Sequence, residues 1–210
     1  MSDLSKIRQD VFDSAIYHVV HEGWSWRALN AAAVDVGIDL TTLRRAFPKG
    51  PHDLVDYFGQ LANKLMVDEL ASFDLSSVPV RERVSIAVRI HIQQGEAHKK
   101  ALRRLFSYLI LPNNILLSVK FTYSIVDAIW YAVGDDSTDF NFYTKRSLLA
   151  GVYISTVLYW FVDESPESDE TWAFLDRRIS DVMRIPKMSS GLIKGGSRIW
   201  SKLMMIRVER

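Results

Sequence analysis

Histidines and carboxylates are the side chains that could hold a metal ion or transfer protons, because this chain contains no cysteine. Disulfides, thiolate metal sites and cysteine nucleophiles are therefore excluded. A di-iron centre in a helical bundle needs paired Glu-x-x-His ligands. No glutamate stands three residues before any of the five histidines, which are His18, His21, His52, His91 and His98. His18 and His21 share one helix face without a third ligand nearby, and we interpret them as surface histidines.

Sequence motifs of other enzyme classes are also missing. The chain has no phosphate-binding loop, no dinucleotide fingerprint and no Gly-x-Ser-x-Gly nucleophile elbow. We therefore expect no catalytic residue, no metal and no cofactor. The sequence predicts a binding protein.

The strongest charge signal lies at the C-terminus. The formal charge of the chain is +1, whereas residues 187–210 contain six Lys or Arg and one Glu, a net charge of +5. On a helical wheel the apolar residues of this segment form one face and the cations lie opposite, which predicts a helix lying in a membrane interface. A helix packed on its own domain or on a second subunit is the alternative. The predicted membrane-binding residues are Leu192, Ile193, Lys194, Arg198, Ile199, Trp200, Lys202, Leu203 and Ile206.

Helical spacing of apolar residues recurs along the whole chain, and alternating strand patterns are scarce. The sequence therefore predicts an all-α fold of about ten helices. Glycines and prolines separate them, and the expected helices cover residues 4–22, 26–36, 41–47, 51–71, 80–94, 97–111, 112–133, 141–162, 167–185 and 190–207. Residues 147–162 lack charged side chains but are too few for a membrane span, which favours a buried core helix.

The second and third expected helices meet at Gly37 with the apolar spacing of a helix-turn-helix. The run GIDLTTLRRAFPKGPHDLVDYF resembles the turn and recognition helix of the TetR family. Arg44, Arg45 and Lys49 could contact DNA, but residues 1–50 contain six basic and six acidic groups. Because DNA binding relies on phosphate neutralisation, this balance argues against DNA as a partner and favours a fold kept as a scaffold.

Residues 127–182 carry a more specific resemblance. The segments GDDSTDFNFYTKR and DETWAFLDRRI are similar to the core of the ubiquinone-biosynthesis accessory family that combines a TetR-like fold with lipid binding. The resemblance implies a protein without catalytic activity that binds an isoprenoid quinone intermediate or a phospholipid. It also implies a membrane surface and a ubiquinone-biosynthesis hydroxylase as partners, and a last helix that can cover the lipid pocket.

The helix expected at 141–162 is apolar on every side, as a central helix should be. Under the family resemblance, part of it lines an elongated lipid cavity together with residues of the preceding helix; plain core packing is the alternative for each residue. The expected lipid-binding residues are Ile125, Ile129, Leu149, Val152, Tyr153, Thr156 and Trp160.

The start of the same helix matches the partner-docking region of the resembled family. The residues concerned are Asp139, Phe142, Tyr143 and Arg146, and Phe142 stands where the family usually has tryptophan. Aromatic residues and arginine are common interface anchors. Packing of Phe142 onto the core is an equal alternative.

These patterns predict three units: a TetR-like helix-turn-helix at 1–50, a helical lipid-binding domain at 51–186 and an amphipathic membrane-binding helix at 187–210. The first ten residues, MSDLSKIRQD, resemble neither a secretory nor a transit signal. We expect a cytoplasmic homodimer, peripherally associated with the inner membrane. A TetR-type regulator with a hydrophobic effector is the second hypothesis.

Overall fold

The structure is a computed structural model that describes residues 4–134 and 140–182, the side chains of 140–142 excepted. The described part is helical and contains no strand, which confirms the all-α fold. The expected amphipathic helix at 187–210 and its predicted membrane-binding residues lie outside the described residues.

An N-terminal unit is formed by α1 (Leu4–Glu22), α2 (Trp26–Val36) and α3 (Leu40–Ala46). Ser25 caps α2 by accepting a hydrogen bond from the backbone N–H of Ala28, and Asp39 caps α3 by accepting one from Thr42 at 2.7 Å. Gly37 ends α2 with φ 74°, a left-handed conformation that glycine adopts readily. The turn between α2 and α3 therefore lies where the sequence predicts it.

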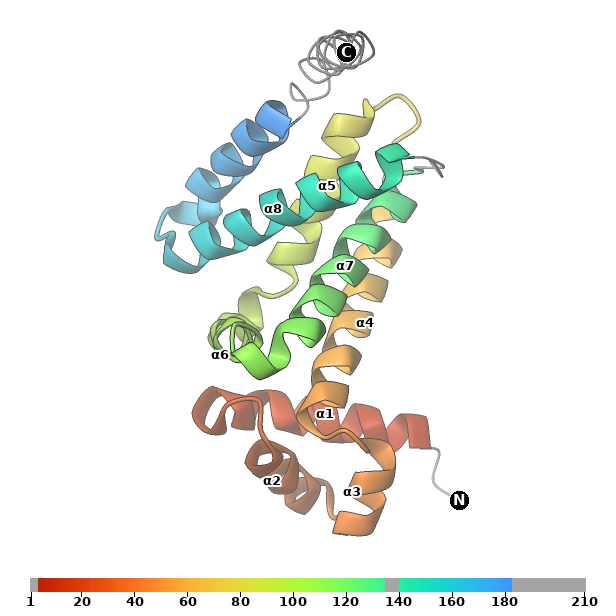
Figure 1. Cartoon of the computed structure of the whole chain (residues 1–210), viewed down its shortest axis with the longest axis vertical. Helices are drawn as coiled ribbons and strands as arrows, with labels where there is room; N and C mark the ends of the chain where they lie inside the picture. The colour runs from red at the N-terminus through yellow and green to blue at the C-terminus, as the bar shows by residue number, and fades with distance from the viewer. Residues whose placement is uncertain (1–3, 135–139, 183–210) are drawn as a thin grey trace, which may run out of the picture.

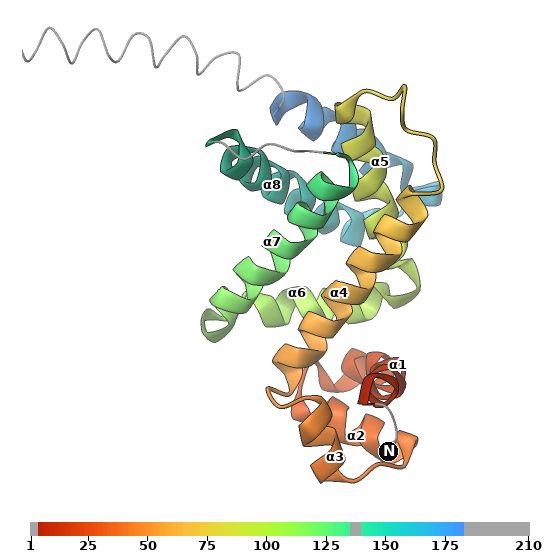
Figure 2. The same cartoon turned by 90° about the vertical axis from the view of Figure 1, so that its right-hand side faces the viewer.

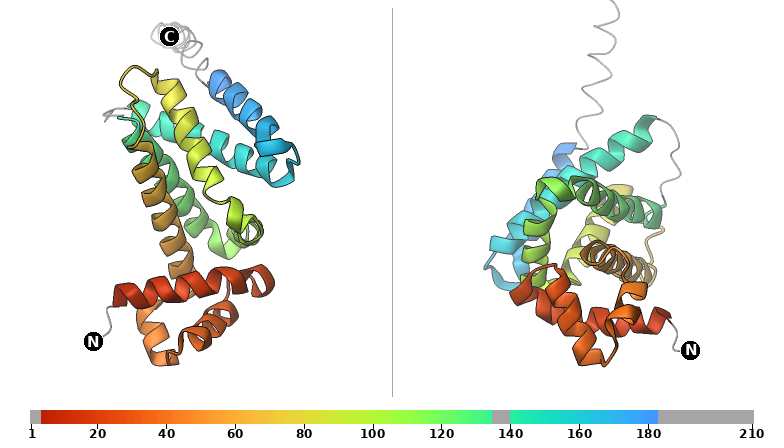
Figure 3. Two further views of the ribbon diagram at one scale, coloured as in Figure 1. Left: turned by 180° about the vertical axis from the view of Figure 1, so that it is seen from behind. Right: turned by 60° about the horizontal axis from the view of Figure 1, so that its bottom comes forward.

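The helix α4 (Pro51–Leu70) rises from this unit and packs between α5 (Val80–Gln93) and α7 (Ile115–Ala132) (Figure 1). The shorter α6 (Lys99–Leu109) packs against α1 and contacts α7, and it runs across the molecule in Figure 2. Two single-turn 3₁₀ segments, η1 (Glu96–His98) and η2 (Pro112–Asn114), precede α6 and α7. Seen from behind, α4 and α5 lie side by side above α1 (Figure 3, left).

The longest helix in the described part of the chain, α8 (Phe140–Val162), crosses the upper part of the molecule in Figure 1. The 3₁₀ segment η3 (Pro166–Ser168) then leads into a helix over residues 169–182. This last described helix returns along α8, and Trp172, Leu175 and Ile179 enter the core from it.

One hydrophobic core extends from the N-terminal unit into the helices above it, from Val11 and Leu29 to Ile125 and Trp160. The indole Nε1 of Trp24, between α1 and α2, donates a hydrogen bond to the backbone carbonyl of Ala101 on α6 at 3.1 Å. The expected boundary at residue 50 coincides with the start of α4. The core nevertheless crosses that boundary without interruption.

Within the described residues, Pro112–Ala132 is long and apolar enough to cross a membrane by length and composition, and 33% of it is buried. Its buried face packs against α4, α5 and α8. Leu116 and Val119, on the opposite face, are 85% and 63% exposed.

A candidate ligand-binding cavity

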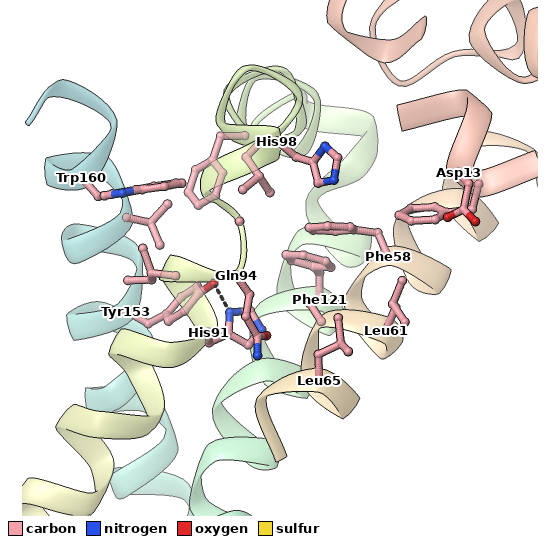
Figure 4. A pocket seen from close by; sticks show the side chains of 17 residues that line it. Asp13, Phe58, Leu61, Leu65, His91, Gln94, His98, Phe121, Tyr153 and Trp160 are labelled. Atoms are coloured by element: carbon pink, nitrogen blue, oxygen red, sulfur yellow. Dashed lines mark hydrogen bonds between the residues drawn. The ribbon is translucent and has the colours of Figure 1, made fainter. Parts of the chain in front are cut away.

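A cavity of about 220 Å³ lies between α1, α4, α5, α6, α7 and α8 (Figure 4). We call it the central cavity. Most of its lining is apolar, with aromatic rings from five elements, namely Phe12, Phe58, Phe106, Phe121 and Trp160. The aliphatic side chains of Leu61, Leu65, Leu102 and Val157 complete much of the wall. A concave, mainly apolar site with a few polar groups is the common form of a small-molecule site.

The polar groups of the inner wall form a hydrogen-bonded chain across four helices. The hydroxyl of Tyr153 on α8 lies 3.0 Å from Nδ1 of His91 on α5, and Nε2 of His91 lies 3.2 Å from Oδ1 of Asn63 on α4. The amide nitrogen of Asn63 donates to the backbone carbonyl of Ser124 on α7 at 3.2 Å. Because that carbonyl only accepts, Asn63 must present its oxygen to His91.

This orientation settles where the protons lie. Nε2 of His91 carries the hydrogen and donates it to Asn63, so Nδ1 is left to accept the hydrogen of Tyr153. Burial lowers the pKa of His91 from 6.5 to about 4 and raises that of Tyr153. Both side chains are therefore neutral at pH 7.

The cavity opens between α1, α4 and the end of α5, where the lining residues Asp13 and Leu65 are exposed. Loss of water raises the pKa of the Asp13 carboxyl, and the neighbouring charge of Asp10 raises it further. Gln94 and His98, which are both partly buried, also line the cavity. The amide nitrogen of Gln94 donates to Oε2 of Glu69 at 2.8 Å.

Two of the seven expected lipid-binding residues, Tyr153 and Trp160, line the central cavity. Val157 completes their stripe on α8, one residue beyond the Thr156 that the sequence suggested. Thr156 is fully buried, and its hydroxyl donates to the backbone carbonyl of Val152.

The other expected lining residues lie elsewhere in the core. Ile125 and Ile129 are fully buried on α7, and neither they nor Val152 belong to the cavity wall. Leu149 lines a separate apolar groove of about 320 Å³, together with Trp130 and Val182. The physical reason is that α8 and α7 pack on several neighbours, so most of their apolar faces meet other helices.

Sequence reasoning missed the contributions of α1, α4, α5 and α6 to the cavity. His91 offered the clearest signal, because it lies on the helix face of buried Ala87 and Val88, but the sequence analysis gave it no role in a cavity. Phe12, Phe58 and Phe121 carry no signal that separates a cavity wall from ordinary core.

Of the expected partner-docking residues, Tyr143 is 68% exposed. Arg146 is 5% exposed, and its Nε lies 2.7 Å from Oδ1 of Asp127 on α7. The guanidinium therefore joins α8 to α7. Asp139 and the side chain of Phe142 lie outside the described residues.

The N-terminal unit holds the remaining candidates. Nε2 of His18 lies 2.6 Å from Oδ2 of Asp35, so the ring joins α1 to α2. Hydrogen bonds from His18, and then from Ser14, lower the pKa of Asp35. Among the described residues, no group of three or more His, Asp or Glu side chains could hold a metal ion. Arg44 and Arg45 are exposed on α3.

The order of the helices and the enclosed cavity define a TetR-like helical fold. The crystal structure of the TetR transcriptional regulator from Nitrosomonas europaea ATCC 19718 is similar, with a TM-score of 0.66 and 22% identity. The match covers 85% of this chain and 98% of that chain. At this identity the likeness concerns the fold alone.

A model of the COQ9 family matches residues 115–186. The mitochondrial ubiquinone biosynthesis protein COQ9 of Rattus norvegicus is 30% identical over 95% of this chain and 66% of its own length. The corresponding COQ9-B of Xenopus laevis is 30% identical over 95% of this chain and 70% of its own length. The chain therefore belongs to the COQ9 family, which confirms the resemblance noted for residues 127–182. It spans slightly less than two thirds of the rat relative.

Proposed function

We propose that this protein takes part in ubiquinone biosynthesis by binding an isoprenoid quinone intermediate in the central cavity and presenting it to a membrane-associated hydroxylase. It acts by binding and positioning rather than by catalysis. The observation that carries this proposal is the central cavity itself, enclosed by aromatic and aliphatic side chains in a chain of the COQ9 family. A phospholipid is the second ligand class that an apolar cavity of this kind accommodates.

The size of the cavity defines what part of the ligand it encloses. Sites for drug-sized ligands commonly measure roughly 300–1,000 Å³, whereas the central cavity measures about 220 Å³. It therefore encloses a ring with the first part of its chain. The rest of the chain leaves between Asp13 and Leu65, where the cavity opens.

Delivery requires a membrane and a partner. We assign membrane binding to the basic, amphipathic residues 187–210, which follow the described helix 169–182. Partner docking is assigned to the start of α8 around exposed Tyr143, and a homodimer is the expected assembly.

Native mass spectrometry of gently purified protein tests the ligand class, with the expectation that a neutral isoprenoid or a phospholipid co-purifies. Val157→Phe adds a ring inside the cavity and should abolish this adduct, because the cavity has no room for both. Ile154→Phe adds the same ring on the same helix, where residue 154 is 37% exposed and outside the wall, and should retain it. Equal adducts on both variants would contradict the proposal.

Liposome flotation tests the membrane assignment. The full chain should float with vesicles containing anionic lipid, whereas a chain ending at Pro186 should remain in the unbound fraction. If both chains float equally, membrane binding does not belong to residues 187–210.

A further inference from the structure

The first polar group facing the ligand is the hydroxyl of Tyr153, which is 7% exposed. Its one hydrogen is donated to Nδ1 of His91, because the Nε2–H of His91 is donated to Asn63 and Nδ1 is left as an acceptor. What remains on the phenolic oxygen is a lone pair. Tyr153 therefore offers the ligand an acceptor.

The second polar group is the amide of Gln94, three residues after His91 and on the same side of the end of α5. Its nitrogen must face Glu69, because the carboxylate 2.8 Å away can only accept. Its oxygen Oε1 is buried and makes no hydrogen bond in the part of the chain that the structure describes. A buried acceptor without a partner destabilises the unliganded protein, and a donor in the ligand would relieve that cost.

The other polar side chains of the wall reinforce this asymmetry. The indole Nε1 of Trp160 donates to Oε2 of Glu96 at 2.9 Å, so its hydrogen is committed. Asp13 contributes a carboxylate at the opening. The donors that remain on lining side chains in the described structure are His98 and the second N–H of Gln94, on the amide nitrogen that faces Glu69.

We propose that the central cavity selects ligands whose ring donates hydrogen bonds, a hydroquinone or phenol, over the quinone of the same skeleton. This inference rests on the proposed function, since it concerns the same cavity. A quinone carries only acceptor oxygens, which would face the lone pairs of Tyr153 and Gln94 and leave both of these acceptors without a donor. To donate to a quinone, Tyr153 would have to abandon His91 and leave Nδ1 unpaired in the core.

A site built to hydrogen-bond a ligand hydroxyl rejects the analogue that lacks it, because the buried groups of the site stay unpaired. Each neutral hydrogen bond contributes roughly a threefold gain in affinity, toward the lower end of its usual net range. With two acceptors, the hydroquinone should bind at least about tenfold more tightly than the quinone.

The test compares three probes that share a three-unit isoprenoid chain: a prenylated hydroquinone under anaerobic reducing conditions, its quinone, and its dimethyl ether. The ether keeps the ring and has no hydrogen to donate, so it separates hydrogen bonding from oxidation state. Dissociation constants are measured by quenching of tryptophan fluorescence on the full chain. We expect the hydroquinone to bind about tenfold more tightly than either other probe.

Gln94→Met keeps the length of the side chain and removes the acceptor, so it should reduce the preference to about threefold or less. Gln93→Met is the matched control, because Gln93 is an exposed neighbour outside the cavity wall, and it should leave the preference unchanged. An unchanged preference in Gln94→Met would overturn the role of Gln94. Quinone binding as tight as hydroquinone binding would overturn the inference while leaving the lipid-binding proposal intact. Absence of binding by all three probes would overturn the lipid-binding proposal and the inference with it.

Discussion

His91 sits in the wall of the central cavity as a neutral ring, and this has a cost that depends on pH. Its folded pKa of about 4 lies below the ordinary 6.5. Between these values the unfolded chain binds a proton that the folded chain does not bind. The free energy of unfolding therefore falls as pH decreases from 6.5 toward 4, and the contribution of His91 is fully present above 6.5.

We predict that lowering the pH from 7 to 5 removes about 2 kcal/mol of stability through His91 alone. Urea unfolding of the native protein and of His91→Gln at both pH values isolates the contribution of His91 to the free energy of unfolding. The other titrating groups are common to the two proteins. The variant should lose correspondingly less stability on acidification. Parallel losses in the two proteins would show that His91 does not titrate as described.

Tyr153→Phe should destabilise the protein by about 1–3 kcal/mol, because Nδ1 of His91 then remains as a buried acceptor without its donor. Tyr131→Phe is the control, since Tyr131 is 79% exposed and its hydroxyl should contribute less than about 0.5 kcal/mol. Both are measured as shifts of the urea midpoint. A similar small shift for the two would contradict the role assigned to the Tyr153 hydroxyl.

The sequence alone identifies some of the individual residues that line the central cavity. Helical spacing in 141–162 correctly places Tyr153 and Trp160 on a shared stripe, because the period of an α-helix fixes which residues share a face. Helical spacing does not reveal which face of α8 lines the cavity and which face packs against α7. That depends on how α4, α5 and α6 are spaced, which no single helix encodes.

Among the connections between helices, Gly50 joins the N-terminal unit to α4. Its φ of 57° is left-handed, and a Cβ there would lie 2.4 Å from the ring of Trp26 on α2. We predict that Gly50→Ala destabilises the protein by about 2 kcal/mol or more, through backbone strain and this clash. Gly151→Ala on α8 should have the opposite sign, a gain of up to about 1 kcal/mol, since nothing lies within 4 Å of the added methyl. Thermal unfolding of both variants checks the pair, and destabilisation by Gly151→Ala to the same extent would contradict it.

Gly59 on α4 packs against the ring of Phe121, and an added Cβ would approach Phe121 Cε2 to 2.9 Å. Because Phe121 lines the cavity, Gly59→Ala should displace the ring into it and weaken ligand binding several-fold. Stability should change little, because the gain in helix propensity, about 1 kcal/mol, offsets the contact. Ligand titration and urea unfolding of the same sample measure the two effects; unchanged affinity would contradict the displacement.

The helices themselves are largely predictable from the sequence. Ranges such as 4–22 and 26–36 agree with α1 and α2, because caps and glycine turns mark their ends. The expected helices at 97–111 and 112–133 instead begin as the separate 3₁₀ turns η1 and η2. In both, helical periodicity continues across the turn, so the pattern of apolar residues does not show the break.

Considered as a whole, the molecule shares one core between α1–α3 and the helices above them. We therefore predict that the chain unfolds in a single cooperative transition, with equal calorimetric and van't Hoff enthalpies. Differential scanning calorimetry makes this measurement. Two transitions would indicate that residues 1–50 fold as an independent domain.

The side chains of Phe12 and Asp13, on α1, reach the wall of the central cavity. A ligand in the cavity thus contacts the helix to which α2 and α3 are attached. Binding equilibria linked in this way are reciprocal. A partner that binds the N-terminal unit and shifts α1 therefore changes the affinity of the cavity for its ligand. The bound ligand changes the affinity of the protein for that partner by the same factor.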